Sequence, residues 1–264
     1  MSREFTVTVA PNGARRTKKD HPALPMTTAE IAETARLCFA AGAGEIHLHV
    51  RDDDGRHSLD TGRYQDAMAA VAQSAPGMAI QITTETAGIY DVTAQFNCLQ
   101  QLTPAAASVS VREMARDEDT ARRLYRFAHE AGTKLQHILY NKDDIAQLAH
   151  WMDQGVVPSD MGTAIFVLGQ YIPAVHATPA DLDVFLTASH ALDLDWTICA
   201  FGPNELACAR AALQTGGNLR VGFENNLHLP DGTLARDNAE LVSLAVKEGR
   251  ALGLTLSDNS KKVA

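Results

Sequence analysis

Strand-like and helix-like segments alternate along the whole of this 264-residue chain. Runs with the composition of β-strands occur at eight places: residues 6–10, 45–50, 79–84, 107–110, 134–139, 163–168, 195–199 and 219–223. Helical patterns fill the gaps, and such alternation indicates parallel strands joined by crossover helices. Eight units predict an α/β fold of the TIM (β/α)8 barrel type rather than an open doubly wound sheet. The GxGxxG motif that would favour the open sheet is missing after every strand.

The clearest helix is predicted directly after Thr27. Glu30 follows three residues later, which makes a capping box, and Gly42 is a typical C-terminal cap. Further helices are predicted to begin near Thr61, Asp91, Asp117, Asp143, Pro179, Asn204 and Asn238. Because no linker, repeat or low-complexity segment interrupts this series, we expect residues 1–264 to form a single barrel domain.

The composition argues against several classes of partner. The chain carries a formal net charge of -9, and its hydrophobic content of 45% is ordinary for a globular protein. An acidic protein is not expected to bind nucleic acid or an anionic membrane surface. The N-terminal residues have a strand pattern rather than that of a signal peptide or membrane span, and the four cysteines lack CxxC spacing. We therefore expect a cytoplasmic protein without disulfides.

Two histidines in the run EIHLHVRDDDG are the strongest candidates for chemistry. His47 and His49 lie two residues apart at the end of a predicted strand, so their imidazoles should point to the same side. Zinc completes such a pair with a carboxylate and keeps a fourth position open for chemistry. We expect Glu224 to supply this carboxylate. In a closed barrel the eighth strand pairs with the first and the first with the second, so a single strand separates Glu224 from the two histidines. A pair of purely structural histidines is the alternative at this point.

The alternation of residues within the strands predicts a polar barrel interior. Polar side chains share one face of their strands, whereas valine and isoleucine occupy the other face. The inward set consists of Thr8, Gln81, Thr83, Glu85, Ser108, Ser110, Gln136 and Arg220. Polar residues around a metal at the carboxyl ends of the strands are what a barrel enzyme requires.

These motifs together resemble those of a known family. The segments that carry the resemblance are APNGARRTKKDHPALPMT, GAGEIHLHVRDDDGRHSLD, AIQITT, IFVLG and TGGNLRVGFENNLHLPDGTLARDNAELV. They are similar to segments of the β-keto acid cleavage enzymes, and they cover nearly the whole chain. HLHVRDDDG and RVGFENN are the most specific, because their order and separation also match.

The resemblance implies a fold, a cofactor and a reaction. It implies a TIM barrel, usually a homotetramer, with a divalent metal, typically zinc, on His47, His49 and Glu224. The reaction it implies is a retro-Claisen exchange, in which a β-keto acid and acetyl-CoA give acetoacetate and a new acyl-CoA. Arg220 matches the family's catalytic arginine. The family's substrate pocket corresponds to Asn12, Arg15, Thr83, Ser108 and Ser110.

Several acidic residues of the family are missing from this chain. Asn225 stands where the prototype has a catalytic aspartate, and an amide cannot take up a proton at neutral pH. Ile138 or Gln136 replaces a second acidic residue, and Arg15 replaces a glutamate that contacts the substrate. Conversely, Glu85 is a carboxylate that many relatives lack, and we expect it to be the catalytic base.

Three interpretations of the function follow from these differences. The first is an acetyl-CoA-dependent β-keto acid cleavage enzyme with a changed proton-transfer apparatus. The second is a zinc lyase or hydrolase that acts on related compounds without CoA. The third is a metal-binding protein that binds a metabolite without catalysis. The sequence favours the first and leaves the other two open.

Overall fold

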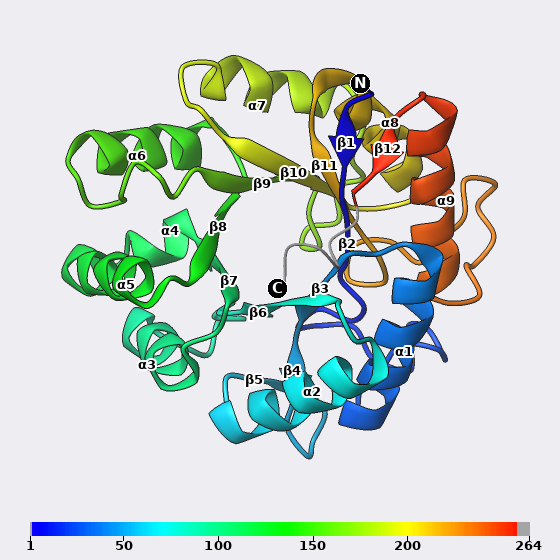
Figure 1. Ribbon diagram of the computed structural model, residues 1–264, viewed down its shortest axis with the longest axis horizontal. Helices are drawn as coiled ribbons and strands as arrows, with labels where there is room; N and C mark the ends of the chain where they lie inside the picture. The colour runs from blue at the N-terminus through cyan, green and yellow to red at the C-terminus, as the bar shows by residue number, and fades with distance from the viewer. Residues whose placement is uncertain (1, 258–264) are drawn as a thin grey trace.

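The computed structural model describes residues 2–257. Eight parallel strands form a closed barrel, and Figure 1 shows this ring of strands with the helices around its outside. The strands follow one another around the barrel in the order β10 (Asp195–Ala200), β11 (Asn218–Val221), β2 (Val7–Val9), β3 (Glu45–Leu48), β6 (Ala79–Thr83), β7 (Ala106–Ser110), β8 (Lys134–Leu139) and β9 (Thr163–Leu168). The predicted TIM barrel is therefore confirmed, including the position of β2 between β11 and β3.

The helices lie on the outside of the barrel between successive strands. They are α1 (Thr28–Ala41), α2 (Thr61–Ser74), α3 (Val92–Leu102), α5 (Glu118–Ala131), α6 (Lys142–Asp153), α7 (Asp181–Ser189), α8 (Glu205–Thr215) and α9 (Asn238–Ala251). The capping box of Thr27 and Glu30 is formed, and Gly42 ends α1 in the left-handed conformation. At α6 the cap is Asn141, whose side chain accepts two main-chain N–H groups.

Several short elements were not predicted. They are the parallel pair β1 (Glu4–Phe5) and β12 (Thr255–Leu256), the hairpin of β4 (Val50–Arg51) and β5 (His57–Ser58), and the helix α4 (Val111–Met114). The predicted strand 45–50 is therefore wrong in part, because β3 ends at Leu48 and leaves His49 between two strands. Strands of two residues are too short to give a periodic signal.

Two kinds of packing separate the inside of the barrel from its outside. Outward-facing side chains such as Val7, Val9 and Ile82 join the helices in one large hydrophobic core. Inside, the Gln81 amide donates to Gln136 at 3.2 Å, and Thr8 donates to Glu45 at 2.9 Å. The predicted polar interior is thus confirmed on this side of the barrel.

The opposite side of the interior is apolar. A second cluster from β8, β9 and β10 consists of Ile138, Ile165, Val167, Cys199 and Phe201. Tyr140 and Tyr171 pack against it from the loops above. One end of the barrel therefore has a polar half and an apolar half.

Within residues 2–257, no helix combines the length and the apolar character that crossing a membrane would require.

A substitution at Gly249 of α9 would test how closely this helix packs against β1. A Cβ atom at this position would overlap the ring of Phe5, which is fully buried. We expect Gly249→Ala to lower the free energy of unfolding by about 1 to 3 kcal/mol, a typical cost of overpacking. Gly62→Ala is the matched control, because it adds the same methyl group at an exposed site in the first turn of α2, where the nearest atom is Asp60 Oδ1 at 3.3 Å, and it should change the free energy of unfolding by less than about 1 kcal/mol. Urea unfolding measures both values, and equal midpoints would contradict this packing.

Candidate functional site

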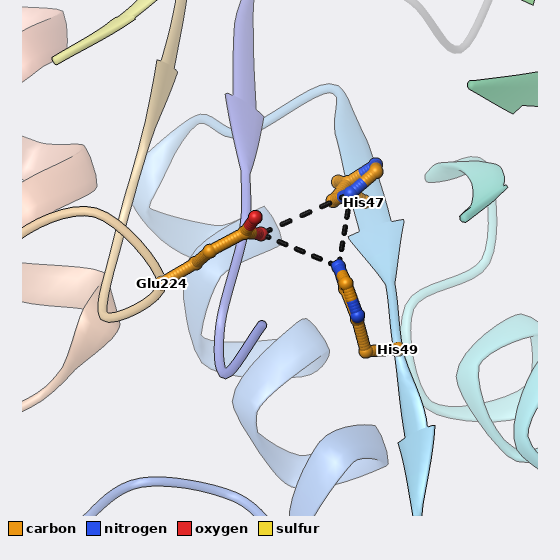
Figure 2. Close-up of side chains that lie close together, drawn as sticks. All are labelled: His47, His49 and Glu224. Carbon is orange, nitrogen blue, oxygen red and sulfur yellow. Dashed lines mark hydrogen bonds and ion pairs between the residues drawn. The ribbon is translucent and has the colours of Figure 1, made fainter. Parts of the chain in front are cut away.

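His47, His49 and Glu224 meet at the carboxyl ends of the strands. Figure 2 shows the two imidazoles projecting from the β3 segment toward the carboxylate, which comes from the loop after β11. The two Nε2 atoms lie 3.1 Å apart, and Glu224 Oε2 lies 3.5 Å from His49 Nε2 and 3.8 Å from His47 Nε2. All three side chains are buried. The sequence therefore identified three residues that the fold does bring together.

The donor atoms of this cluster suit a divalent cation. The Nδ1 atom of His47 lies 2.7 Å from Gln81 Oε1, so this nitrogen carries the proton and the lone pair of Nε2 faces the cluster. Burial and the nearby Arg220 hold the pKa of His47 well below its usual range, so the ring is neutral. Glu224 Oε2 has no hydrogen-bond partner among residues 2–257. Two imidazoles and a carboxylate with their ligand atoms within 4.8 Å form a possible metal site.

Arg220 keeps the Glu224 carboxylate charged. Its Nη2 atom lies 3.4 Å from Glu224 Oε1, and both side chains are buried. Burial alone would raise the pKa of Glu224, but Arg220 and the two imidazoles hold it well below its usual range. The Nε and Nη1 atoms of Arg220 have no acceptor in the part of the chain that the structure describes. They are therefore available to an anionic group in the cavity.

The loop that carries Glu224 is held from several directions. The predicted strand 219–223 is wrong at its end, because β11 stops at Val221 and Gly222 takes a φ of +133°. The main-chain N–H groups of Gly222 and Phe223 donate to Glu205 and Asn238. This turn, rather than strand alternation, directs Glu224 toward Arg220.

Arg16 and Tyr171 complete the hydrogen bonding of this loop. Arg16 donates to the carbonyl oxygen of Phe223 at 2.7 Å, and the Tyr171 hydroxyl donates to that of Glu224. On the near side, Gly13 leaves no room for a side chain, since a Cβ atom there would lie 2.6 Å from Glu224 Cγ. The position of the carboxylate is thus fixed by residues far apart in the sequence.

A cavity of about 440 Å³ opens above the cluster. Three arginines and three glutamates line it, namely Arg15, Arg112, Arg220, Glu85, Glu113 and Glu224. A bound divalent cation would leave this balanced set with a net positive charge, which suits anionic substrates. The other wall is formed by the apolar cluster and by Tyr140 and Tyr171.

Glu85 lies on the polar wall, two residues beyond the end of β6. Its Oε1 atom is 3.7 Å from Arg15 Nη2, and its side chain is 23% exposed. His57 bonds to its main-chain oxygen at 2.8 Å, which fixes the backbone here. Burial raises the pKa of the Glu85 carboxyl, although His49 and Arg15 oppose this shift. A carboxyl group of this kind can take up and release a proton.

The other predicted residues divide into two groups. Arg15, Thr83 and Ser110 line the cavity together with Glu85 and Arg220. Ser108, Asn12 and Asn225 are buried and are not among its lining residues. The Asn12 side-chain amide donates to the carbonyl oxygens of Pro25 and His49. It therefore holds the main chain at His49 in place. The side-chain amide of Asn225 has no hydrogen-bond partner among the described residues.

Sequence reasoning missed Arg112, Glu113, Tyr140 and Tyr171. Arg112 and Glu113 belong to the unpredicted helix α4, and both tyrosines lie in loops after strands. Arg112 forms two close contacts with Asp144 and lies over the Tyr140 ring at 4.1 Å. Their positions directly after the predicted strands were the available signal, because barrel active sites are built from such loops.

Comparison with known proteins identifies the family of this chain. A family model described as beta-keto acid cleavage enzyme matches residues 4–261. The 3-keto-5-aminohexanoate cleavage enzyme of Fusobacterium nucleatum subsp. nucleatum is 32% identical, with 96% of this chain and 94% of that protein covered. The 3-oxoadipate:acetyl-CoA acetyltransferase of Cupriavidus necator is 28% identical, with 92% and 87% covered.

A solved structure agrees on the fold. A complex of ObcA with oxaloacetate matches with a TM-score of 0.68 at 17% identity, and the match covers 91% of this chain and 66% of that chain. At this identity the likeness concerns the fold alone. The sequence relationship is stronger and spans nearly the whole length. The chain therefore belongs to the beta-keto acid cleavage enzyme family, which confirms the resemblance of its motifs.

Proposed function

We propose that this protein cleaves a β-keto acid by exchange with acetyl-CoA, giving acetoacetate and a new acyl-CoA, and that it requires zinc. The observation that carries the proposal is the buried His47, His49 and Glu224 cluster beside Arg220 at the bottom of an open cavity. Membership in the family and the acetyl-CoA named in the Cupriavidus necator relative support the choice of reaction.

The residues of the chain have distinct tasks in this exchange. A proton leaves C2 of the keto acid, and C2 bonds to the acetyl carbon of acetyl-CoA as the bond from that carbon to the CoA sulfur breaks. The released CoA thiolate then adds to C3, the bond from C2 to C3 breaks, and a proton returns to C2, which gives acetoacetate and the new acyl-CoA. Zinc on the two imidazoles and Glu224 would polarise the carboxylate and carbonyl oxygens of the substrate. Arg220 adds a fixed positive charge beside the developing oxyanion. Thr83 and Ser110 offer hydroxyl groups to the substrate carboxylate.

We assign the proton transfer to Glu85. Asn225, at the position of the family's catalytic aspartate, cannot accept a proton, and Ile138 is apolar. Among the cavity carboxylates, Glu224 is engaged by Arg220, and Glu113 accepts bonds from Thr86 and Gln95. Within the described part of the chain, the only contact of the Glu85 carboxylate with a charged group is the longer one of 3.7 Å to Arg15. It is thus the carboxylate most able to exchange a proton with a substrate.

We also propose that the substrate ends in a neutral or anionic group. Arg15 lines the cavity where the prototype has a glutamate, and its side chain is half-exposed and able to turn toward a ligand. The Cupriavidus necator relative is named for 3-oxoadipate, which has a carboxylate at its far end. A cytoplasmic location and a homotetramer are retained as expectations from the sequence, and light scattering would test the latter.

The first test concerns the metal. We expect one zinc per chain in protein purified without chelators. Loss of a residue that only hydrogen-bonds to a metal ligand typically weakens metal affinity roughly 10- to 100-fold, so loss of a ligand itself in His49→Ala should weaken zinc binding by more than this. Elemental analysis measures the content. His190→Ala is the control, because this exposed histidine at the end of α7 should leave the metal content unchanged. Full metal content in His49→Ala would contradict the assignment.

The second test concerns the charge of the substrate. We expect kcat/KM for 3-oxoadipate to exceed that for 3-keto-5-aminohexanoate, and Arg15→Ala to reduce this preference roughly tenfold, since a charge-assisted hydrogen bond contributes about 1.5 to 3 kcal/mol. Lys19→Ala is the control, because Lys19 is exposed in the same loop and does not line the cavity. A preference for the amino-substituted keto acid would refute the proposal.

The third test concerns the proton. Glu85→Gln should lower kcat at least about 100-fold while zinc remains bound, as expected when a general base is lost. Glu113→Gln is a matched control on the same cavity wall, and it should lose less than about tenfold if no proton passes through it. Near wild-type activity of Glu85→Gln would place the base elsewhere.

Turnover without CoA would favour a lyase or hydrolase, and ligand binding without turnover would favour a metabolite-binding protein.

A further inference from the structure

A second space adjoins the candidate site. A groove of about 330 Å³ lies between the loop after β8, the loop after β9 and the first turns of α7. Four residues line both this groove and the cavity above the metal cluster, namely Tyr140, Val167, Gly169 and Gln170. The groove is therefore a lateral extension of the site toward the surface.

Exposed apolar side chains gather around this groove. Val175 is 48% exposed and Val184 is 53% exposed, and both line it. Ile172, at 78% exposed, lies in the same loop and lines the cavity. Single exposed hydrophobic residues need no explanation, but several beside one groove mark a binding surface.

Hydrogen bonds within the chain hold the edge of the groove. Gln170 and Val175 exchange two main-chain hydrogen bonds of 3.1 Å each, which close a small turn over the strand end. Opposite this turn, the Tyr140 ring lies under the Arg112 guanidinium, and the Tyr140 main-chain N–H donates to Asp144 at 2.7 Å. Both walls are therefore fixed, which lowers the entropic cost of binding an extended chain.

The apolar surface of the groove continues into the cavity. Val167 lines both spaces, and behind it Ile138 and Phe201 form the apolar wall that faces the metal cluster. The polar wall with Thr83, Glu85 and Arg220 lies on the other side. A ligand that is apolar along its length and reacts at one end would thus lie in the groove with its reactive end at the metal.

The size of the proposed cosubstrate requires such an extension. A cavity of about 440 Å³ accommodates a β-keto acid and a thioester group, but not a whole CoA molecule beside them. The pantetheine arm of CoA is a long uncharged chain with methyl and methylene groups, and it must reach the surface. We infer that the groove between Tyr140, Val175 and Val184 binds the pantetheine arm of the acetyl-CoA cosubstrate. This inference rests on the proposed function.

Val184→Glu tests the inference by placing a charge in the groove. Because Val184 is half-exposed on α7, the variant should fold, and circular dichroism checks this. We expect the Kd for acetyl-CoA, measured by isothermal titration calorimetry, to rise at least tenfold, and KM for acetyl-CoA to rise in parallel. KM for the keto acid should stay within twofold. Leu37→Glu is the matched control, because it makes the same change at an exposed apolar site on α1.

A shortened thioester sharpens the test. S-Acetyl-N-acetylcysteamine keeps the reactive end of acetyl-CoA but lacks most of the arm, so Val184→Glu should use it as well as the wild type does. Unchanged acetyl-CoA binding by Val184→Glu would overturn the inference while leaving the proposed reaction intact. Wild-type protein that binds acetyl-CoA in the groove without turnover would instead contradict the reaction. A change of oligomeric state with unchanged acetyl-CoA affinity would identify the groove as a subunit interface and also overturn the inference.

Discussion

Closure of the barrel is the constraint on which the site depends. Only because β11 pairs with β2, and β2 with β3, can a carboxylate near residue 224 reach imidazoles at residues 47 and 49. The hydrogen bonds of parallel strands fix this geometry, and the helices outside bury the apolar face that stabilises it. His47, His49 and Glu224 thus come together because the barrel closes, although Glu224 lies far from the two histidines along the chain.

The buried charges of Arg220 and Glu224 balance each other inside the barrel. A buried carboxylate would be costly without a partner of opposite charge, and Arg220 supplies that charge from one turn earlier in the chain. Among residues 2–257, two guanidinium nitrogens of Arg220 still have no acceptor and one carboxylate oxygen of Glu224 has no donor. Buried polar groups of this kind are tolerated where a ligand completes them, so the unsatisfied atoms of the cluster agree with a site for a cation and an anionic substrate.

The carboxyl end of the barrel has a polar half and an apolar half, and together they define how a ligand would be oriented in the site. The polar half holds Glu85 and Arg220, to which we assign the chemistry, whereas the apolar half leads through Val167 and Tyr140 to the surface groove. The loop after β9 joins both halves, because Tyr171 bonds to the main chain of Glu224 and Val175 borders the groove. A change in this loop would therefore affect both the metal cluster and the groove.

The sequence by itself determined the barrel and the capping box of α1, and it singled out His47, His49 and Glu224 as candidate metal ligands. The barrel and the cap rest on local periodicity and spacing, which a single chain displays directly, whereas the choice of Glu224 rests on the expected closure of the barrel and on the resemblance of its motif. Only the tertiary structure decided that a left-handed turn at Gly222 orients Glu224, that Asn12 and Asn225 lie outside the cavity, and that Arg112 and Tyr140 border it. Such features depend on short elements and on contacts between distant loops, for which the sequence carries no periodic signal.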